Sequence, residues 1–403
     1  MKVTCLDTLD SAWAAAEAWQ MLASKNPMHS PEWLLSWWRA FGESNQLMVL
    51  QCQDTDGQVV GIAPFYLERE FGSVAIRSLG SGEVCSDYIR ILSQEGREQD
   101  VSIAVTEYLT SFCKKHSATQ SACISIEGVE ADAPWLDEFC RSTKSKGFQN
   151  WLQPITSSFR LKLPNSMDEY LRSLGDSAKR KGKKLVSKLR SGSVSWHSTD
   201  QRSTDQQSTT RFESTQTNTD QGSNILTRLS ELQRLHQARR VMLDQPGCFS
   251  NANFENFLTE AVELLSKRGL ARIDWCEVEG KTVATHLVLK GNDTLFMYQS
   301  GLDPAAMKLE PGHLLMIASI QNAIERGVHY YDTLRGDEKY KTYWGGAAVS
   351  LATLHCRPPH LFSQVAGFSQ FRFWQLKQAA KRILASANLY PQGTARAAAS
   401  TGS

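Results

Sequence analysis

The sequence predicts an α+β protein made of two halves that share one plan, and three observations support this. Its 403 residues exceed the length at which a single core keeps growing, so two domains are expected. Residues 47–79 contain three apolar runs separated by turns, and residues 271–300 repeat that arrangement. Strand and helix patterns follow each set of three runs. Each half is therefore expected to be an antiparallel meander joined to strand and helix units.

Composition and charge narrow the classes of function. The chain is 41% apolar with a formal net charge of +2, so its overall charge does not attract nucleic acid or an anionic membrane. Its nine cysteines form no CxxC pair and no cluster with histidines at metal-ligand spacing, which predicts reduced thiols, no structural disulfide and no metal site. The N-terminus lacks signal-peptide features, and no apolar run reaches about eighteen residues. These features predict a cytoplasmic protein.

We expect the N-terminal half to span residues 1–155. A helix should begin after Ser30, which can cap it, because Pro31 and Glu32 suit a first helical turn. The meander that follows turns at Asp56-Gly57. Residues 98–116 and 133–146 read as helices on either side of a buried strand.

The C-terminal half is expected at residues 156–360. Its meander turns at Glu279-Gly280, a helix follows over 311–326, and strands are predicted at 327–335 and 349–356. Between the halves, a basic helix at 179–190 precedes a flexible Ser/Thr/Gln-rich insertion at about 198–224. A further helix over 361–390 and a frayed tail over 391–403 complete the prediction.

Two short features could supply binding or catalytic groups. The helix that begins at Pro311 and Gly312 presents unpaired N–H groups, which can cradle a pyrophosphate or a thioester oxygen, and Gly312 allows close approach. An ordinary helix start explains the same residues, and His313 is more often a packing histidine than a base. His286 lies in a strand, where it either packs or, facing a cleft, accepts a substrate proton.

The stretch YYDTLRGDEKYKTYWGG, residues 330–346, concentrates charged and aromatic side chains after a strand. Asp332 and Asp337 can take a proton from an amine, and Tyr340 can return one to a leaving group. Arg335 and Lys341 can hold phosphates or a carboxylate. The alternative is a salt-bridged loop that closes the sheet, and the residue types alone do not decide between the two.

SGLDP, the Pro-Gly helix start and RGDEKYK, together with HSPEWLLSWWRAFGE and VVGIAPFYLE, resemble the CelD/BioF-family acetyltransferases of the GNAT superfamily, relatives of the FemAB aminoacyltransferases. The resemblance covers residues 28–357 apart from the insertion. It implies two tandem GNAT-like halves, with an acyl-donor site in the second. It also implies direct transfer of an acyl group to an amine, without a metal or a covalent intermediate, which agrees with the absence of a convincing Cys/His nucleophile pair. The matching positions are Asp332, Arg335, Gly336, Asp337, Tyr340, Lys341, Pro311 and Gly312.

The resemblance implies acyl-CoA as co-substrate, with acetyl-CoA as the first choice, and a sugar, amino acid or polysaccharide precursor as acceptor, as in exopolysaccharide or cell-envelope biosynthesis. The usual Gly-rich phosphate loop is absent from the sequence, which leaves an acyl carrier protein or an aminoacyl-tRNA as other donors. The basic helix at 179–190 bears on the choice of acyl donor. Because the insertion is short, an aminoacyl-tRNA is the less favoured donor. The alternative from another class of function is a non-catalytic accessory protein of polysaccharide assembly. The acceptor and the oligomeric state are not predicted.

Overall fold

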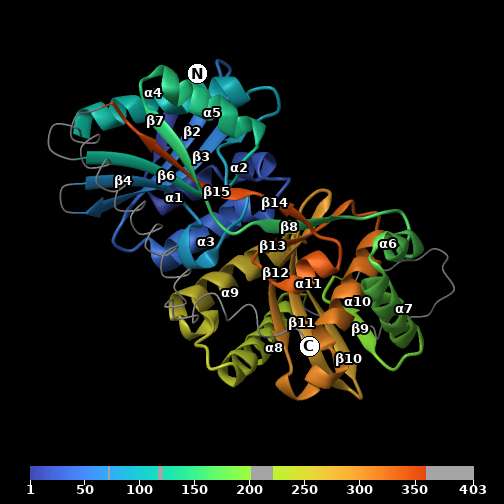
Figure 1. Ribbon diagram of the computed structural model, residues 1–403. Coiled ribbons are helices and arrows are strands. Elements are labelled where there is room, and N and C mark those ends of the chain that lie inside the picture. Colours follow the sequence, from blue (N-terminus) through green and yellow to red (C-terminus); the bar gives the residue numbers. More distant parts are fainter. Residues whose placement is uncertain (71–72, 117–120, 201–220, 360–403) are drawn as a thin grey trace, which may run out of the picture.

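A computed structural model describes residues 1–70, 73–116, 121–200 and 221–359. The strands of these residues form two sheets, one in each half of the molecule, and helices flank both sheets (Figure 1). This is the α+β architecture that the sequence predicts. The predicted core of the insertion, the C-terminal helix over 361–390 and the tail over 391–403 lie outside the described residues.

The first sheet has the strand order β1-β2-β3-β4-β6-β15-β7, and β5 pairs with β3. Neighbouring strands are antiparallel except β4 and β6. Its strands are β1 (Lys2–Leu6), β2 (Gln46–Gln53), β3 (Val59–Glu70), β4 (Ser73–Ser78), β5 (Leu92–Ser93), β6 (Ser121–Glu130), β7 (Gln149–Pro154) and β15 (Leu351–Arg357). The accompanying helices are α1 (Leu9–Ala14), α2 (Ala16–Leu22), η1 (Pro27–His29), α3 (Pro31–Phe41), η2 (Gly82–Val84), α4 (Glu98–His116) and α5 (Pro134–Ser145).

The second sheet has the order β14-β8-β13-β12-β11-β10-β9. Its strands are β8 (Ser158–Lys162), β9 (Ser195–Ser198), β10 (Ala271–Val278), β11 (Lys281–Lys290), β12 (Thr294–Leu302), β13 (Tyr330–Arg335) and β14 (Ala347–Val349). The helices are α6 (Met167–Ser173), α7 (Asp176–Arg190), α8 (Gln221–Met242), η3 (Cys248–Ser250), α9 (Ala252–Lys267), η4 (Pro304–Leu309), α10 (Pro311–Glu325) and α11 (Lys339–Tyr343). In Figure 1, α8 and α9 lie on one side of this sheet, and α7 and α10 on the other.

A two-stranded ribbon connects the sheets. The chain leaves the first sheet through β7 and enters the second as β8, and it returns through β14 to end in the first sheet as β15. β14 pairs with β8, and β15 pairs with β7. The strand at 351–357 was expected in the C-terminal half, so that part of the predicted boundary is wrong. Its alternating apolar residues fill a place between β6 and β7.

The larger hydrophobic core spans both halves. Trp33 on α3, in the first half, makes edge-on ring contacts at 4.8 Å with Phe257 on α9 and with Tyr298 on β12. The predicted cap of α3 is present, since the hydroxyl of Ser30 accepts a hydrogen bond from the N–H of Trp33. The aromatic face of this helix therefore packs the halves together.

Candidate functional site

The second sheet opens between β12 and β13. These parallel strands pair only over Thr294–Phe296 and Tyr330–Asp332, although β12 continues to Leu302 and β13 to Arg335. Register shifts mark both strands near this point. The helix α10, which connects the two strands, begins beyond the end of β12, and therefore at the end where the strands separate. Backbone groups of β12 and the first turn of α10 thus border the same opening.

Asp332 holds the bend in β13. Its carboxylate is fully buried and accepts hydrogen bonds from the Tyr88 hydroxyl (2.6 Å), the Ser158 hydroxyl (2.9 Å) and Arg160 Nε (2.9 Å). It also accepts one from the N–H of Leu334 at 2.8 Å. Leu334 has a left-handed backbone with φ of 57°, an uncommon conformation for a residue with a branched side chain. Four donors on a buried carboxylate favour a positioning role for Asp332, which we propose in place of the predicted proton transfer.

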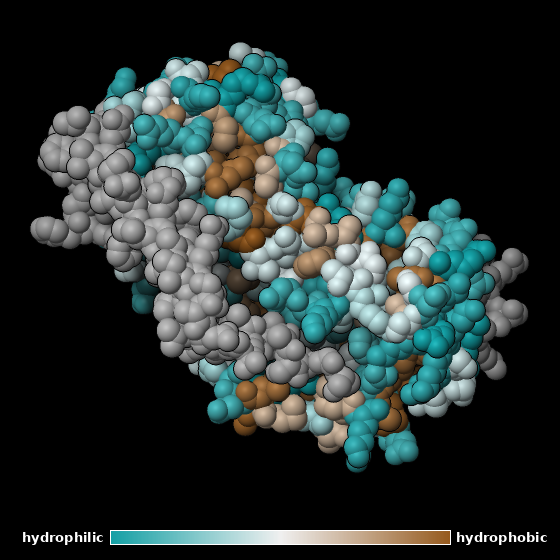
Figure 2. Space-filling view, viewed as in Figure 1, coloured by the Kyte–Doolittle hydropathy of each residue, from teal (hydrophilic) through white to brown (hydrophobic). Residues whose placement is uncertain are grey.

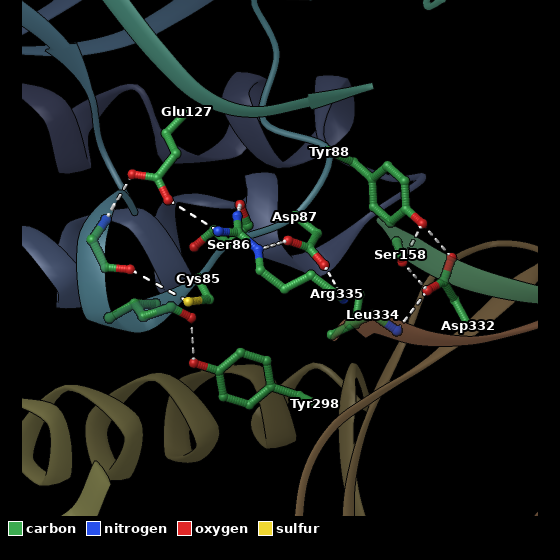
Figure 3. A network of polar contacts seen from close by, with 12 residues as sticks. Cys85, Ser86, Asp87, Tyr88, Glu127, Ser158, Tyr298, Asp332, Leu334 and Arg335 are labelled. Carbon is green, nitrogen blue, oxygen red and sulfur yellow. Dashed lines mark hydrogen bonds and ion pairs between the residues drawn. The ribbon is translucent and has the colours of Figure 1, made fainter. Parts of the chain in front are cut away.

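Arg335 joins the halves instead of facing the opening (Figure 3). Its Nε pairs with the fully buried carboxylate of Asp87, its N–H donates to the same carboxylate at 2.7 Å, and Nη1 donates to Glu127 at 3.0 Å. Burial alone would lower the pKa of Arg335, but the Asp87 carboxylate raises it above the ordinary value. The guanidinium is occupied by these partners, so the structure does not favour the predicted phosphate contact.

Lys341 also points inward. It is 2% exposed, and its ammonium donates to the carbonyl oxygens of Leu334 (3.0 Å) and Arg335 (2.8 Å). A Cβ atom at Gly336 would lie 2.6 Å from this ammonium, so the close approach of Lys341 requires glycine there. For Lys341 and Gly336 the contacts favour the alternative interpretation, a loop closed by internal ion pairs. Its partner in that loop is Glu338, 3.0 Å from Nζ.

The remaining predicted acids and bases lie apart. Asp337 is exposed in the loop before α11, whereas Tyr340 is half-buried against the core of the second half, and burial raises its pKa well above the ordinary value. His286 is buried in β11, where burial lowers its pKa to about 3 and its Nδ1 has no hydrogen-bond partner among the described residues. His286 therefore lies in the interior as a neutral packing residue. The structure does not bring these three side chains together.

At the start of α10, where the sequence predicts unpaired N–H groups, Pro311 carries no N–H, and the N–H groups of His313 and Leu314 donate to the carbonyl oxygen of Glu310. The N–H of Gly312 is therefore the group of this first turn that an anion would contact. Trp344 Nε1 donates to His313 Nδ1 at 2.9 Å, which leaves the other ring nitrogen of His313 as the N–H. Glu310, just before Pro311, pairs with Lys181 on the basic helix α7. A Cβ at Gly312 would make only ordinary contacts, 3.4 Å from Leu302, so packing does not require glycine. A ligand that approaches the backbone closely is compatible with it.

The sequence pattern missed the segment that completes this region. Ser86, Asp87 and Tyr88 belong to the first half, more than two hundred residues away from the stretch 330–346 that they contact. Tyr88 has a φ of 66°, and the guanidinium of Arg160 lies over its ring at 4.8 Å. No spacing in the sequence links this loop to the motif, because only the folded chain brings them together. Gly80 and Gly82, both with a left-handed backbone, precede this loop in the chain.

Comparisons with known proteins agree with this fold. Residues 199–342 match the model of a family described as an acetyltransferase (GNAT) domain. The crystal structure of FemX superposes with a TM-score of 0.59 at 12% identity, covering 91% of this chain and 99% of that one. A conserved protein of unknown function from Bacteroides thetaiotaomicron VPI-5482 gives 0.53 at 12% identity, with 88% and 100% covered. No curated protein matches the sequence significantly.

Two further features concern the described residues alone. No three of their His, Cys, Asp and Glu side chains form a group that would hold a metal ion. None of their helices is both long and apolar enough to cross a membrane. Residues 199–342 thus match a GNAT acetyltransferase domain, and the two sheets with their flanking helices give the chain a fold similar to that of FemX.

Proposed function

We propose that the protein is an N-acyltransferase that moves an acyl group from acyl-CoA to an amino group, with acetyl-CoA as the first candidate donor. The observation that carries this proposal is the opening between β12 and β13 with the start of α10 at its wide end. Backbone groups of β12 beyond its pairing with β13 would hold the pantetheine arm of the donor, as an added strand is held by a sheet edge. Those of Ser300 are excepted, because His236 and Gln299 already occupy them. They would also place the thioester between the two separated strands.

The start of α10 would hold the phosphates. Its first turn carries the positive end of the helix dipole, and Gly312 leaves the backbone accessible. Lys181 lies beside this turn through its ion pair with Glu310, and Lys184 contributes a second positive charge nearby. Cations at the helix start would compensate for the missing Gly-rich loop. Pro311, Gly312 and His313 therefore remain our proposed donor-binding residues.

Proton transfer requires groups at the opening. Asp337 is accessible to solvent and is the member of the motif that we retain as a candidate acid or base, while Tyr340 is less accessible. The attacking amine must be neutral, so its proton must leave before or during attack on the thioester. We propose as acceptor an amino group of a sugar, an amino acid or a polysaccharide precursor. This choice rests on the resemblance to the CelD/BioF family.

A second candidate donor is an aminoacyl-tRNA. The outer face of α7 exposes Arg180, Lys183, Lys184 and Arg190, next to the start of α10. This side of the molecule is strongly hydrophilic (Figure 2). Such a face suits a polyanion larger than CoA. Reversing the charges of Lys183, Lys184 and Lys188 should abolish tRNA retention at low salt if this donor is used, and unchanged retention would exclude it.

The test of the main proposal measures free thiol released from a panel of acyl-CoA thioesters in the presence of glucosamine, lysine or another simple amine. We expect amine-dependent release with at least one thioester, and a CoA-dependent rise in the melting temperature. Neither release nor a thermal shift with any thioester would contradict a CoA-dependent enzyme. The binding result alone, without release, would favour the non-catalytic accessory protein.

A further inference from the structure

Two arginines with unused hydrogen-bond donors lie where the halves meet. Arg160 on β8 binds the buried carboxylate of Asp332 through Nε at 2.9 Å, and its side chain is 29% exposed. The half-buried Arg90, just before β5, donates from Nε to the carbonyl oxygen of Ile91 at 3.4 Å. Among the residues that the structure describes, no hydrogen bond reaches the terminal nitrogens of either guanidinium. Partly buried arginines rarely leave these donors unused, because withdrawing them from water costs free energy.

A half-buried carboxylate, that of Glu130 at the end of β6, lies beside both arginines. Its Oε1 is 3.9 Å from Arg160 Nη1, which is an ion pair too long for a hydrogen bond. Burial raises the pKa of Glu130, and the positive charges of Arg160 and Arg90 oppose that rise. Two further carboxylates, those of Glu98 and Asp132, lie within electrostatic reach of these groups. The region therefore offers free guanidinium donors together with a surplus of carboxylates.

This region lies at the narrow end of the opening, on the face that turns toward the first half. Asp332, beside Tyr88 in Figure 3, is the last residue of β13 that pairs with β12, opposite Phe296. The ring of Tyr88, over which the guanidinium of Arg160 lies, is 6.3 Å from the ring of Phe296. Phe296 belongs to the core shared with the first half, whereas Tyr331 belongs to the core that includes α10. A molecule bound here therefore reaches the opening from the face opposite α10.

The loop that leads to Arg90 is fixed from several sides. His29 Nε2 donates to the carbonyl oxygen of Tyr88 at 2.7 Å, and Asn26 Nδ2 donates to that of Asp87 at 3.5 Å. Tyr88 keeps a left-handed backbone, with φ of 66°, inside this set of contacts. Strained backbone that its surroundings hold in place is concentrated at functional sites. Arg90 is therefore carried by a rigid loop that leads directly to the opening.

We infer that Arg90, Arg160 and Glu130, the acceptor cluster, bind an acceptor that carries a carboxylate beside its amino group, as a free α-amino acid does. The unused donors of the two arginines hold the carboxylate, and Glu130 holds the ammonium group. The amino group of a neutral sugar has no anion to satisfy the arginines. This inference rests on the proposed acyltransferase function and narrows its acceptor to zwitterionic amines.

The acyl transfer is direct in this arrangement. The Glu130 carboxylate takes one proton from the bound ammonium, and the neutral nitrogen forms a bond to the acyl carbon of the thioester. The bond between that carbon and the donor sulfur breaks, and the second proton that the nitrogen loses goes to the departing thiolate. The products are an N-acyl amino acid, the free donor thiol and a proton on Glu130, which returns to solvent.

The test compares each proteinogenic L-amino acid with its methyl ester as acceptor, using the full chain and acetyl-CoA, and measures the thiol released. We expect release with at least one amino acid. Arg90→Gln should lower kcat/KM for that amino acid roughly 10- to 100-fold, because charge-assisted hydrogen bonds to its carboxylate are lost. The methyl ester lacks the carboxylate, so the same variant should change its kcat/KM less than about 2-fold. Glu130→Gln should slow both acceptors, since both carry the amine.

Arg141→Gln provides the matched control, because Arg141 on α5 is an exposed arginine of the first half that pairs with Glu138. It removes the same charge and should leave both acceptors unchanged. Equal losses in Arg90→Gln and Arg141→Gln, or equal losses with the amino acid and its ester, would overturn the inference. Release with glucosamine but with no amino acid would overturn it while the proposed function stands.

Calorimetry with the same amino acids, with and without CoA, separates this inference from the proposed function when no thioester reacts. Binding that Arg90→Gln weakens at least about 10-fold, with an unchanged urea midpoint, supports the acceptor cluster although the donor is then wrong. Arg90→Lys, which keeps the charge but loses the planar fork, is the second variant if Arg90→Gln does not fold. No binding of any amino acid, or binding that the Arg90 variants leave unchanged, overturns the inference.

Discussion

Asp332 and Lys341 hold opposite ends of one residue, Leu334. The carboxylate of Asp332 accepts from the Leu334 N–H at 2.8 Å, and the ammonium of Lys341 donates to the Leu334 carbonyl oxygen at 3.0 Å. The left-handed backbone of Leu334, with φ of 57°, is stabilised by charged hydrogen bonds on both sides. These contacts bend β13 at the point where it separates from β12, so two charged residues of the motif shape the opening without lining it.

Replacing Asp332 should destabilise the fold strongly. Asp332→Asn removes the charge that faces Arg160 and places an amide among hydrogen-bond donors, so we expect a loss of about 3 kcal/mol in the free energy of unfolding. Urea unfolding measures this loss. The control is Asp337→Asn, an exposed position in the same motif, which should change stability by less than about 0.5 kcal/mol. Equal losses in the two variants would contradict a positioning role for Asp332.

Replacing Lys341 should lower the stability of the protein more than replacing Lys339, although the two residues are only two positions apart. Lys341→Met leaves two buried carbonyl oxygens without their donor, which should cost about 2 kcal/mol of stability. Lys339→Met changes an exposed side chain and should leave the unfolding transition within about 0.5 kcal/mol of the wild type. Similar midpoints for both variants in urea would show that the Lys341 contacts contribute little.

Replacement by alanine should have different effects at two glycines of the predicted site: weaker binding at Gly312 and lower stability at Gly336. Gly312→Ala meets no steric obstacle in the fold, so we expect unchanged thermal stability but weaker binding of acetyl-CoA by calorimetry. Gly336 has a φ of 137°, and an added Cβ would meet both Glu338 and Lys341, so Gly336→Ala should lower the melting temperature. Unchanged acetyl-CoA affinity in Gly312→Ala would remove the start of α10 from the donor site.

Stability should fall as the pH is lowered below about 6.5, because of buried histidines. The folded-state pKa of His286 is about 3 because of burial, whereas its ordinary value is 6.5. Between these values the unfolded state binds a proton that the folded state does not, so His286 removes about 2 kcal/mol of stability at pH 5.

Urea unfolding at pH 7 and pH 5 tests this. His286→Leu should reduce the difference between the two pH values by about that amount, while the exposed His329→Gln should leave it unchanged. His29, with a pKa lowered to about 3, should account for a similar share of the remaining difference. An unaltered pH difference in His286→Leu would contradict the assignment.

The secondary structure could be predicted from local patterns. The helix 98–116 has the predicted bounds, and the predicted helix 311–326 ends one residue earlier, because capping residues, glycines and apolar periodicity act within one element. The two meanders also appear as predicted around Asp56-Gly57 and Glu279-Gly280. The strand at 351–357 was found, but its place in the first sheet was not, because pairing with β6 and β7 involves residues about two hundred positions away.

By itself, the sequence determined the α+β class, the two halves and the position of a motif rich in charged residues. The tertiary structure alone decided how those charges are used: Asp332 and Lys341 are buried, Arg335 is half-buried between its partners, and Asp337 faces solvent. It also brought Glu130 of the first sheet to Arg160 of the second. The physical reason is that a side chain's chemistry depends on burial and on its hydrogen-bond partners, and distant segments supply both.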